Sequence, residues 1–356
     1  MQRHIFRYLS LEVEHDAYDS DDQMELFNRC DIRQRETIQR LIGIVSAGLA
    51  PRVRTFTVLG ASHLDHFSQP WVDKEHGLDM NWGDHKELTR AQFKAAVIPV
   101  FFATLGHYTG LQTLSLESIT LDLSTHAAFA SLHNLIDLQM DDIILLEPFT
   151  PSIQFRLETL TLSRIMYPHE LHRIDPLPAN FCTPQSLNSL YLGKLSDQVV
   201  TSLAVIKSLV KDGGEFTSLT ILEVAIRKAD MQMFLPLLSQ CSSLTDLMVN
   251  ITPREGDFLR QEEPMADWRE DILPDISADT CPQLKYFAGP FNVAEKIVPG
   301  RPISHLSILD DGLAGTRRTL ESMEQLLRSW NGEDMEIFRY KGCQTRQNAL
   351  LCVRAF

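Results

Sequence analysis

The residues that could do chemistry gather in a few parts of this sequence. Residues 60–88 hold four histidines and four aspartates together with Trp71 and Trp82. The run His63-Leu64-Asp65-His66 offers imidazole and carboxylate groups, which are ordinary metal ligands. A proline and two glycines interrupt the stretch, so no helix fixes the geometry of the histidine pair. We expect a surface loop here, with partner contact through the two tryptophans and a metal site as the alternatives.

Catalytic patterns are missing from the rest of the chain. The six cysteines, at positions 30, 182, 241, 281, 343 and 352, form no CxxC pair, and we expect reduced and mostly buried thiols. The chain also contains no GxSxG, GxxxxGK[ST] or HExxH motif. The sequence therefore predicts a protein that is not an enzyme, with no catalytic residues, no cofactor and no metal.

The longest insertion, residues 253–280, is acidic. Its carboxylates outnumber its three arginines, and Phe258, Trp268 and Ile272 are interleaved with them. One interpretation is a solvated loop or short helix. The other is an acidic patch, anchored by Trp268, that recruits a basic segment of a partner.

The charge balance excludes several classes of partner. The chain has 33 lysines and arginines against 47 aspartates and glutamates, a net charge of −14. A nucleic-acid binder normally presents a basic face, and anionic membranes attract basic segments, so neither is expected. No apolar run approaches the roughly 20 residues that span a bilayer, and no signal-peptide core follows the first arginines. We expect a cytoplasmic or nuclear protein.

A short pattern, LxxLxL, recurs along the chain. Six good copies begin at Leu111, Leu135, Leu157, Leu187, Leu219 and Leu244, and looser copies begin at Val53, Leu284, Ile303 and Met335. The pattern describes a residue that enters the core, followed by a short strand with two inward side chains. The copies from Leu111 onward are separated by 19 to 40 residues, against about 20–29 in a regular leucine-rich repeat, so the repeats carry insertions.

Helical apolar stripes fill the gaps between the copies. They lie in residues 87–105, 199–210, 231–238 and 320–327. A strand and a helix that alternate in this way cannot bury their apolar faces alone and must stack on their neighbours. The sequence predicts an α/β leucine-rich-repeat solenoid, a horseshoe with a parallel β-sheet on the concave face and helices on the convex face.

The residue three places before the first leucine is apolar. It is Cys241 or Cys281 in two copies, and Tyr108, Leu132 and Phe216 in three others. We expect it to fill a tight corner rather than to do chemistry. The CxxLxxL form resembles the cysteine-containing leucine-rich repeats of F-box proteins.

The first 59 residues carry a further resemblance. The segment QRHIFRYLSLE at residues 2–12, a helix expected from Arg33 to Leu49 with Ile38, Leu41, Ile42 and Val45 on one face, and a strand ending at Val58 resemble the region that follows the F-box in fungal F-box/leucine-rich-repeat proteins. Residues 1–50 contain no counterpart of the F-box itself, with its leading Leu-Pro and later tryptophan. We therefore expect three parts: a capping strand–helix–strand region at 1–59, an insertion and helix at 60–110, and irregular repeats at 111–356.

The resemblance implies a non-catalytic substrate-recognition part of an F-box-type ubiquitin ligase receptor. Binding to a Skp-type adaptor is expected only if an F-box lies upstream. The alternative is a stand-alone leucine-rich-repeat scaffold or regulator with no ligase link.

The inner wall of the solenoid is the expected binding surface. Its side chains are those that alternate with the inward leucines, and they become more aromatic and apolar toward the later repeats. We expect a monomer that binds a protein partner on this wall or on the insertions. The wall as read from the pattern contains no lysine or arginine before Arg339 and Lys341 on the last and weakest copy, so phosphorylated ligands would find little to pair with. A merely solvated wall is the alternative. The candidate partner-binding residues are Tyr191, Glu223, Asp246, Met248 and Tyr286, with Trp71, Trp82 and Trp268 on the insertions.

Overall fold

The structure is a computed structural model in which the chain forms two compact units. It describes residues 7–12, 23–60, 97–146, 154–166, 182–193, 202–210, 215–227, 230–252, 273–274, 276–277, 279–309, 335–340 and 350–355. The first unit consists of Met1–Phe155 and Arg164–Ile174, and the second of Arg156–Ser163 and Asp175–Phe356.

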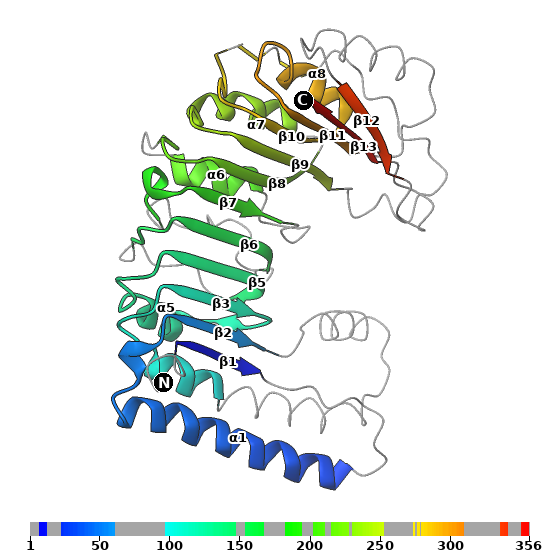
Figure 1. The fold of residues 1–356 in the computed structure, drawn as a ribbon. Helices are drawn as coiled ribbons and strands as arrows, with labels where there is room; N and C mark the ends of the chain where they lie inside the picture. Colours follow the sequence, from blue (N-terminus) through cyan, green and yellow to red (C-terminus); the bar gives the residue numbers. More distant parts are fainter. Residues whose placement is uncertain are drawn as a thin grey trace, which may run out of the picture. The chain divides into compact units, whose positions relative to one another are not determined.

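The first unit is built on parallel strands. In order across the sheet they are β1 (Tyr8–Glu12), β2 (Thr55–Leu59), β3 (Thr113–Glu117) and β5 (Asp137–Leu145), and the short β4 (Thr120–Leu121) pairs with the end of β5. Figure 1 shows these strands side by side. The helical elements between them are α1 (Gln23–Ser46), the 3-10 turn Ala50–Arg52, a helical segment at residues 97–105, and α5 (Leu123–Phe129).

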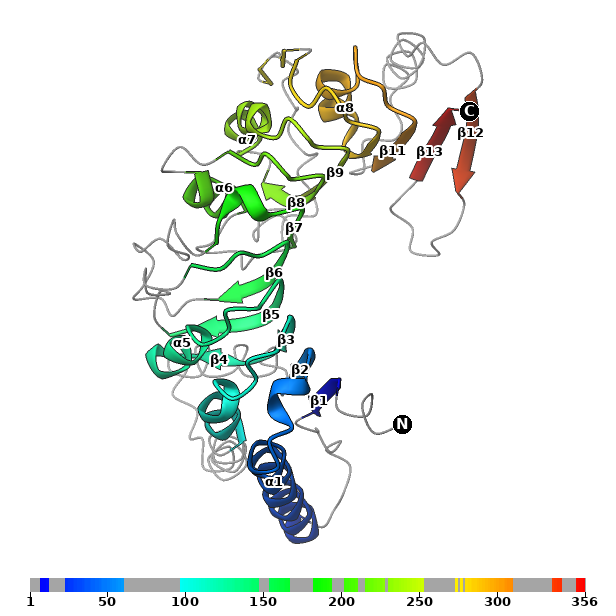
Figure 2. The same ribbon diagram turned by 60° about the vertical axis from the view of Figure 1, so that its left-hand side comes forward.

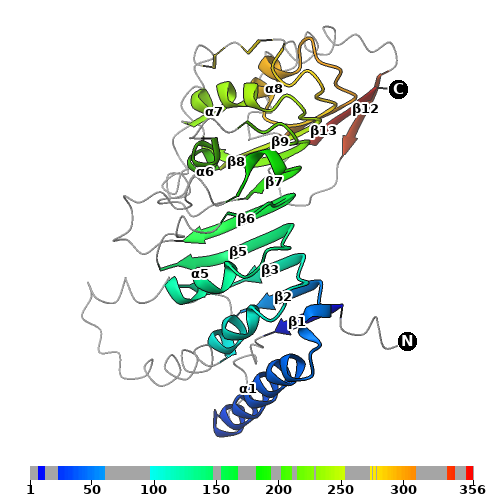
Figure 3. The same ribbon diagram turned by 90° about the vertical axis from the view of Figure 1, so that its left-hand side faces the viewer.

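The second unit repeats the same arrangement. Its parallel strands are β6 (Thr159–Met166, which passes into the first unit at Arg164), β7 (Ser189–Leu192), β8 (Ile221–Arg227), β9 (Asp246–Thr252), β10 (Tyr286–Gly289) and β11 (His305–Leu309). The helices are α6 (Ser202–Val210), α7 (Met231–Leu237) and α8 (Phe291–Ile297), with 3-10 turns at Pro184–Ser186 and Leu238–Gln240. Figures 2 and 3 show these three helices on one side of the strands.

The repeat pattern builds the core. Each of the six good copies of LxxLxL has its three apolar side chains at most 2 % exposed, while the residues between them on the strand are partly exposed. This alternation follows from the two-residue period of a strand whose one face is covered by helices. The looser copies at Val53, Leu284 and Ile303 bury their apolar positions in the same way. The chain is an α/β leucine-rich-repeat solenoid with an open parallel sheet and irregular repeats, as the sequence predicts.

A tight corner precedes β2, β3, β5, β7, β9 and β10. The N–H of the first leucine donates to the carbonyl of the residue three places earlier, as in Leu111 to Tyr108 (2.9 Å) and Leu284 to Cys281 (3.1 Å). The residue at that earlier position is buried whether it is tyrosine, leucine or cysteine. The expected apolar corner is therefore confirmed, and the backbone bond explains why it must be compact.

The described helices agree with the sequence in part. α6 and α7 bury the predicted stripes, and the helix expected at 87–105 is described from Val97 onward; the stripe at 320–327 lies outside the described residues. α1 begins ten residues before the expected Arg33, and its inward face was predicted correctly in part. Leu41 is buried and Ile38 and Val45 are half-buried, as expected, but Ile42 is 49 % exposed and Ile44 is buried instead.

The last predicted copy is a strand of a different kind. Met335–Tyr340 forms β12, which pairs antiparallel with β13 (Leu350–Ala355), and β13 in turn lies antiparallel to β11. The pattern identified a strand correctly, but the strand belongs to a hairpin at the end of the parallel series rather than to another parallel repeat.

A buried arginine stabilises the turns around α8. Arg301 is 6 % exposed and donates from Nε to the Thr280 carbonyl (2.7 Å), from Nη2 to the Ser277 carbonyl (2.8 Å) and from Nη1 to the Ile297 carbonyl. Burial lowers the pKa of Arg301. Because several backbone carbonyls surround the cation, it satisfies groups at the end of α8 that would otherwise be buried without donors.

The buried His126 predicts that the stability of the first unit depends on pH. The side chain is 1 % exposed, and burial lowers its pKa below the usual 6.5, with Asp122 partly opposing the shift. The unfolded chain therefore binds more protons than the folded chain as the pH falls below 6.5, and the free energy of unfolding should fall with it. We expect His126→Gln to flatten this decline in urea unfolding followed by circular dichroism between pH 8 and pH 5. The exposed His133, changed to glutamine, is the matched control. Equal pH dependence in wild type and His126→Gln would contradict this assignment.

Candidate functional site

The predicted wall residues lie on adjacent strands of the second unit. Tyr191 is on β7, Glu223 on β8, Asp246 and Met248 on β9, and Tyr286 on β10. All five are half-buried, and each alternates along its strand with a buried core residue. The structure thus brings these five candidates together on the sheet face opposite the helices.

The strand register arranges this face in two rows. In the first row Ile221 lies beside Asp246 and Asp246 beside Tyr286. In the second row Tyr191 lies beside Glu223 and Glu223 beside Met248. Each carboxylate therefore has a large apolar or aromatic neighbour on both sides, within the usual reach of cross-strand side-chain contact.

The first row continues onto β11. His305 pairs with Tyr286, and their ring centroids are 6.5 Å apart. Ser304 Oγ lies 3.0 Å from His305 Nδ1, and Thr245 Oγ1 donates to Asp246 Oδ2 over 2.6 Å. These contacts limit the rotamers of His305 and Asp246, so part of the surface is already ordered before any partner arrives. In the second row, the next position, Ala288, is only 1 % exposed, so it offers no surface.

The three candidate tryptophans remain predictions. Trp71 and Trp82, with the histidine-rich stretch around them, and Trp268 in the acidic insertion lie outside the described residues.

The expectation that the wall lacks basic residues was wrong. β8 continues two residues past the last position that the pattern predicted. Arg227 is therefore half-buried and lies on the same face of β8 as Glu223. In the first unit, Arg164 donates from Nε to Asp141 Oδ1 (2.9 Å) and from Nη2 to Asp141 Oδ2 (2.6 Å). The pattern missed Arg227 because it ended that strand too early. It missed Arg164 because the left-handed backbone at that residue interrupts the two-residue alternation of the strand.

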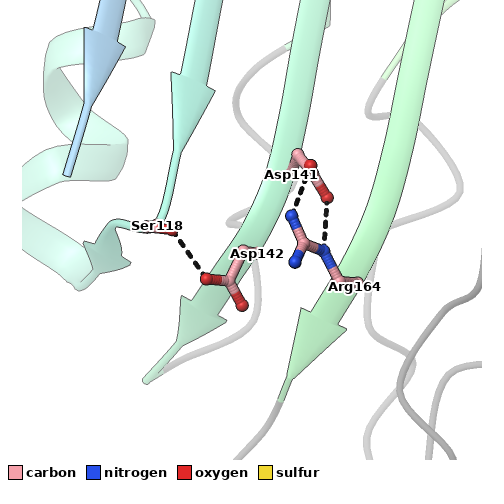
Figure 4. Close-up of polar contacts among 4 residues, drawn as sticks. All are labelled: Ser118, Asp141, Asp142 and Arg164. Atoms are coloured by element: carbon pink, nitrogen blue, oxygen red, sulfur yellow. Dashed lines mark hydrogen bonds and ion pairs between the residues drawn. The ribbon is translucent and has the colours of Figure 1, made fainter. Parts of the chain in front are cut away.

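Arg164 belongs to a polar cluster at the strand ends of the first unit. Figure 4 shows Arg164 facing Asp141, and Ser118 reaching the next residue, Asp142. Ser118 Oγ donates to Asp142 Oδ2 over 2.6 Å, and these two side chains are 5 % and 1 % exposed. Asp141 raises the pKa of Arg164. Ion pairs between partly exposed side chains contribute little to stability unless they are bidentate, and the Arg164–Asp141 pair is bidentate.

The same cluster contains an unusual backbone feature. Ser118, Asp142 and Arg164 have φ of 55°, 56° and 49°, and each stands seven residues after the first leucine of its copy. The left-handed conformation costs a residue other than glycine roughly 1–2 kcal/mol, with aspartate among the more tolerant. The hydrogen bond and the ion pair offset that cost. We interpret the cluster as a structural device that bends the chain directly after β3 and within β5 and β6.

The equivalent position in the preceding copy is Gly60. A Cβ there would lie 2.1 Å from the Ser118 carbonyl oxygen, so only glycine fits. A recurring position that holds glycine in one copy and polar residues in the next three was the signal from which the cluster could have been found in the sequence.

The described thiols are poor nucleophiles. Cys182, Cys241 and Cys281 are free and buried. Burial raises the pKa of Cys281 to about 11 and of Cys182 to about 12, and it raises that of Cys241 as well. Since the thiolate is the reactive form, these cysteines serve packing, as expected.

Two further searches were confined to the described residues. No group of three or more histidine, cysteine, aspartate or glutamate side chains that could hold a metal occurs among them. No helix in that part of the chain is both long enough and apolar enough to cross a membrane.

The Ser118–Asp142 contact gives a stability prediction. Asp142→Ala removes a buried charge-assisted hydrogen bond and places alanine at a left-handed φ, so we expect a loss of about 2–4 kcal/mol in the free energy of unfolding. Asp142→Asn keeps an acceptor and tolerates the backbone, so its loss should be clearly smaller. Urea titration followed by circular dichroism measures both. Equal losses for the two variants would show that neither backbone tolerance nor the Ser118 bond matters.

Comparison with known proteins adds little to this description. No family model matches the chain, and no curated protein matches it. Among solved structures, a match was found to the leucine-rich-repeat ectodomain of the plant membrane receptor kinase GASSHO1/SCHENGEN3 from Arabidopsis thaliana, in complex with CASPARIAN STRIP INTEGRITY FACTOR 2. The identity is 14%, the TM-score is 0.26, and the match covers 54% of this chain and 24% of that one.

Proposed function

We propose that the chain is a protein-interaction module that binds its partner on the open sheet face of the second unit. The observation that carries the proposal is the two-row arrangement of Tyr191, Glu223, Asp246, Met248 and Tyr286 on adjacent strands. Aromatic and methionine side chains supply the anchors that dominate protein interfaces, and they stand here on a hydrogen-bonded sheet.

The chemistry of the face favours a partner with hydrogen-bond donors or positive charge. Glu223 and Asp246 accept hydrogen bonds, and their apolar neighbours would shield such bonds from water. Arginine and lysine side chains of a partner would fit both the carboxylates and their apolar neighbours, since their aliphatic stems pack on apolar groups while their charged heads reach carboxylates. The role is binding rather than catalysis, in keeping with the buried, unreactive thiols.

The finer proposal is that this module recognises substrates for an F-box-type ubiquitin ligase, in the cytoplasm or nucleus. It is supported by the resemblance of residues 1–59, whose expected strand, helix and strand correspond in order to β1, α1 and β2. Ubiquitin transfer itself would then be carried out by other subunits. A stand-alone scaffold or regulator with no ligase link is the alternative.

Site-specific crosslinking tests the binding face. A photoreactive phenylalanine in place of Tyr191 or Tyr286 should give the same crosslinked partner in cells, because the two positions share one face. The matched control is Gln232, an exposed residue on α7. Glu223→Lys combined with Asp246→Lys should weaken binding of the crosslinked partner by at least about tenfold. A partner captured from Gln232 and from neither tyrosine would place the interface elsewhere.

Adaptor binding separates the two versions of the function. If the ligase version is right, the protein expressed from its natural gene should co-purify with a Skp-type adaptor, and proteasome inhibition should raise the level of the partner identified by crosslinking. If the adaptor is absent from purifications that do contain the crosslinked partner, the stand-alone version holds and the binding face is unaffected.

A further inference from the structure

β1 is the edge strand of the sheet among the described residues of the first unit. Within the described part of the first unit, β1 pairs with β2 alone. The Arg7 carbonyl accepts from the N–H groups of Arg54 (3.0 Å) and Thr55 (3.1 Å). Because backbone groups alternate in direction along a strand, Leu9 and Leu11 also bond toward β2, and Tyr8, Ser10 and Glu12 direct their N–H and C=O groups away from it. Such an edge is a template for one more strand.

A crevice runs beside this edge, between β1 and α1. Its volume is about 220 Å³, and its floor is formed by Leu11 of β1, Phe56 of β2, and Leu41 and Ile44 of α1. Each of these four side chains is at most 7 % exposed, so the floor is rigid and apolar. Small-molecule pockets usually measure about 300–1,000 Å³, so this crevice suits one or two aliphatic side chains rather than a whole ligand.

The rim of the crevice is polar and basic. Thr37, Ser10 and Arg40 line it, and Arg40 is exposed. Arg7 does not line the crevice, but it is exposed at the start of β1, and its guanidinium lies 6.0 Å from the centre of the Tyr8 ring, which is itself 66 % exposed. This local positive charge contrasts with the chain's net charge of −14. A partner segment with acidic side chains is complementary to the rim, and a basic segment is not.

We propose that β1 is a second docking site, which takes an extended acidic segment of a partner protein as an added strand. The segment pairs with the outer backbone groups of Tyr8, Ser10 and Glu12. It seats an aliphatic side chain in the crevice between β1 and α1, and its carboxylates reach Arg7 and Arg40. This site lies wholly in the first unit and is independent of the wall described above.

The test uses synthetic peptides as probes on the full chain. The fluorescently labelled hexapeptide Asp-Leu-Asp-Leu-Asp-Leu should bind in fluorescence anisotropy, with an affinity that falls as salt rises. The corresponding Asp-Ala peptide should bind more weakly, because alanine does not fill the crevice, and the Lys-Leu peptide should not bind. Hydrogen exchange should show new protection confined to residues 8–12 and 37–44. Equal binding of the Lys-Leu peptide, or no binding of the Asp-Leu peptide, overturns the proposal.

Two variants identify the contacts. Arg40→Glu should weaken binding of the Asp-Leu peptide by about tenfold. Arg52→Glu, a matched charge reversal at an exposed position that does not line the crevice, should leave it unchanged. Ser10→Pro removes an N–H that points away from β2, a change that edge strands tolerate, so the protein should fold and lose the peptide. Unchanged binding by a folded Ser10→Pro variant would rule out strand addition.

Discussion

Within each unit, the sheet depends on one backbone carbonyl per repeat that accepts two N–H groups from the next repeat. The Arg54 carbonyl accepts from Gln112 (2.8 Å) and Thr113 (2.9 Å), and the Thr245 carbonyl accepts from Lys285 (2.8 Å) and Tyr286 (2.9 Å). The accepting residue directly follows the first apolar residue of each copy, at the point where the strand begins. We call this carbonyl, which accepts two N–H groups, the forked carbonyl. It fixes the strand register at this point, and a slip of one residue would exchange the buried and exposed faces of the strand.

This constraint explains why the repeats tolerate irregular spacing. Each copy needs only a compact corner, a forked carbonyl and two inward side chains, together a few residues long. The segments between copies can differ in length because a longer loop adds little entropy cost. The threonine at the forked position of one repeat reinforces it, since Thr220 Oγ1 donates to the Asn188 carbonyl over 3.0 Å.

The proposed function depends on the side of the sheet that the helices leave open. Because the register is fixed at the strand starts, Glu223 stands beside Met248 and Asp246 beside Tyr286. A surface of this kind is ordered before binding, which reduces the entropy lost when a partner docks.

The two ends of the parallel series differ in how their edges are arranged. An edge strand leaves backbone donors and acceptors without a neighbouring strand to pair with. In the second unit the antiparallel β13 and β12 follow the last parallel strand, whereas in the first unit β1 ends the series beside α1 and a crevice.

The sequence by itself determined the buried positions of the repeats, the corners before them, and the side chains that alternate outward, because each depends on local spacing and apolarity. It also placed Tyr191, Glu223, Asp246, Met248 and Tyr286 on one face. Only the tertiary structure decided that Arg164 binds Asp141, 23 residues earlier, and that Ser118 binds Asp142, 24 residues later. It alone revealed the crevice beside β1. These features join residues on different elements, so they depend on strand register, left-handed backbone turns and helix orientation, none of which a leucine pattern encodes.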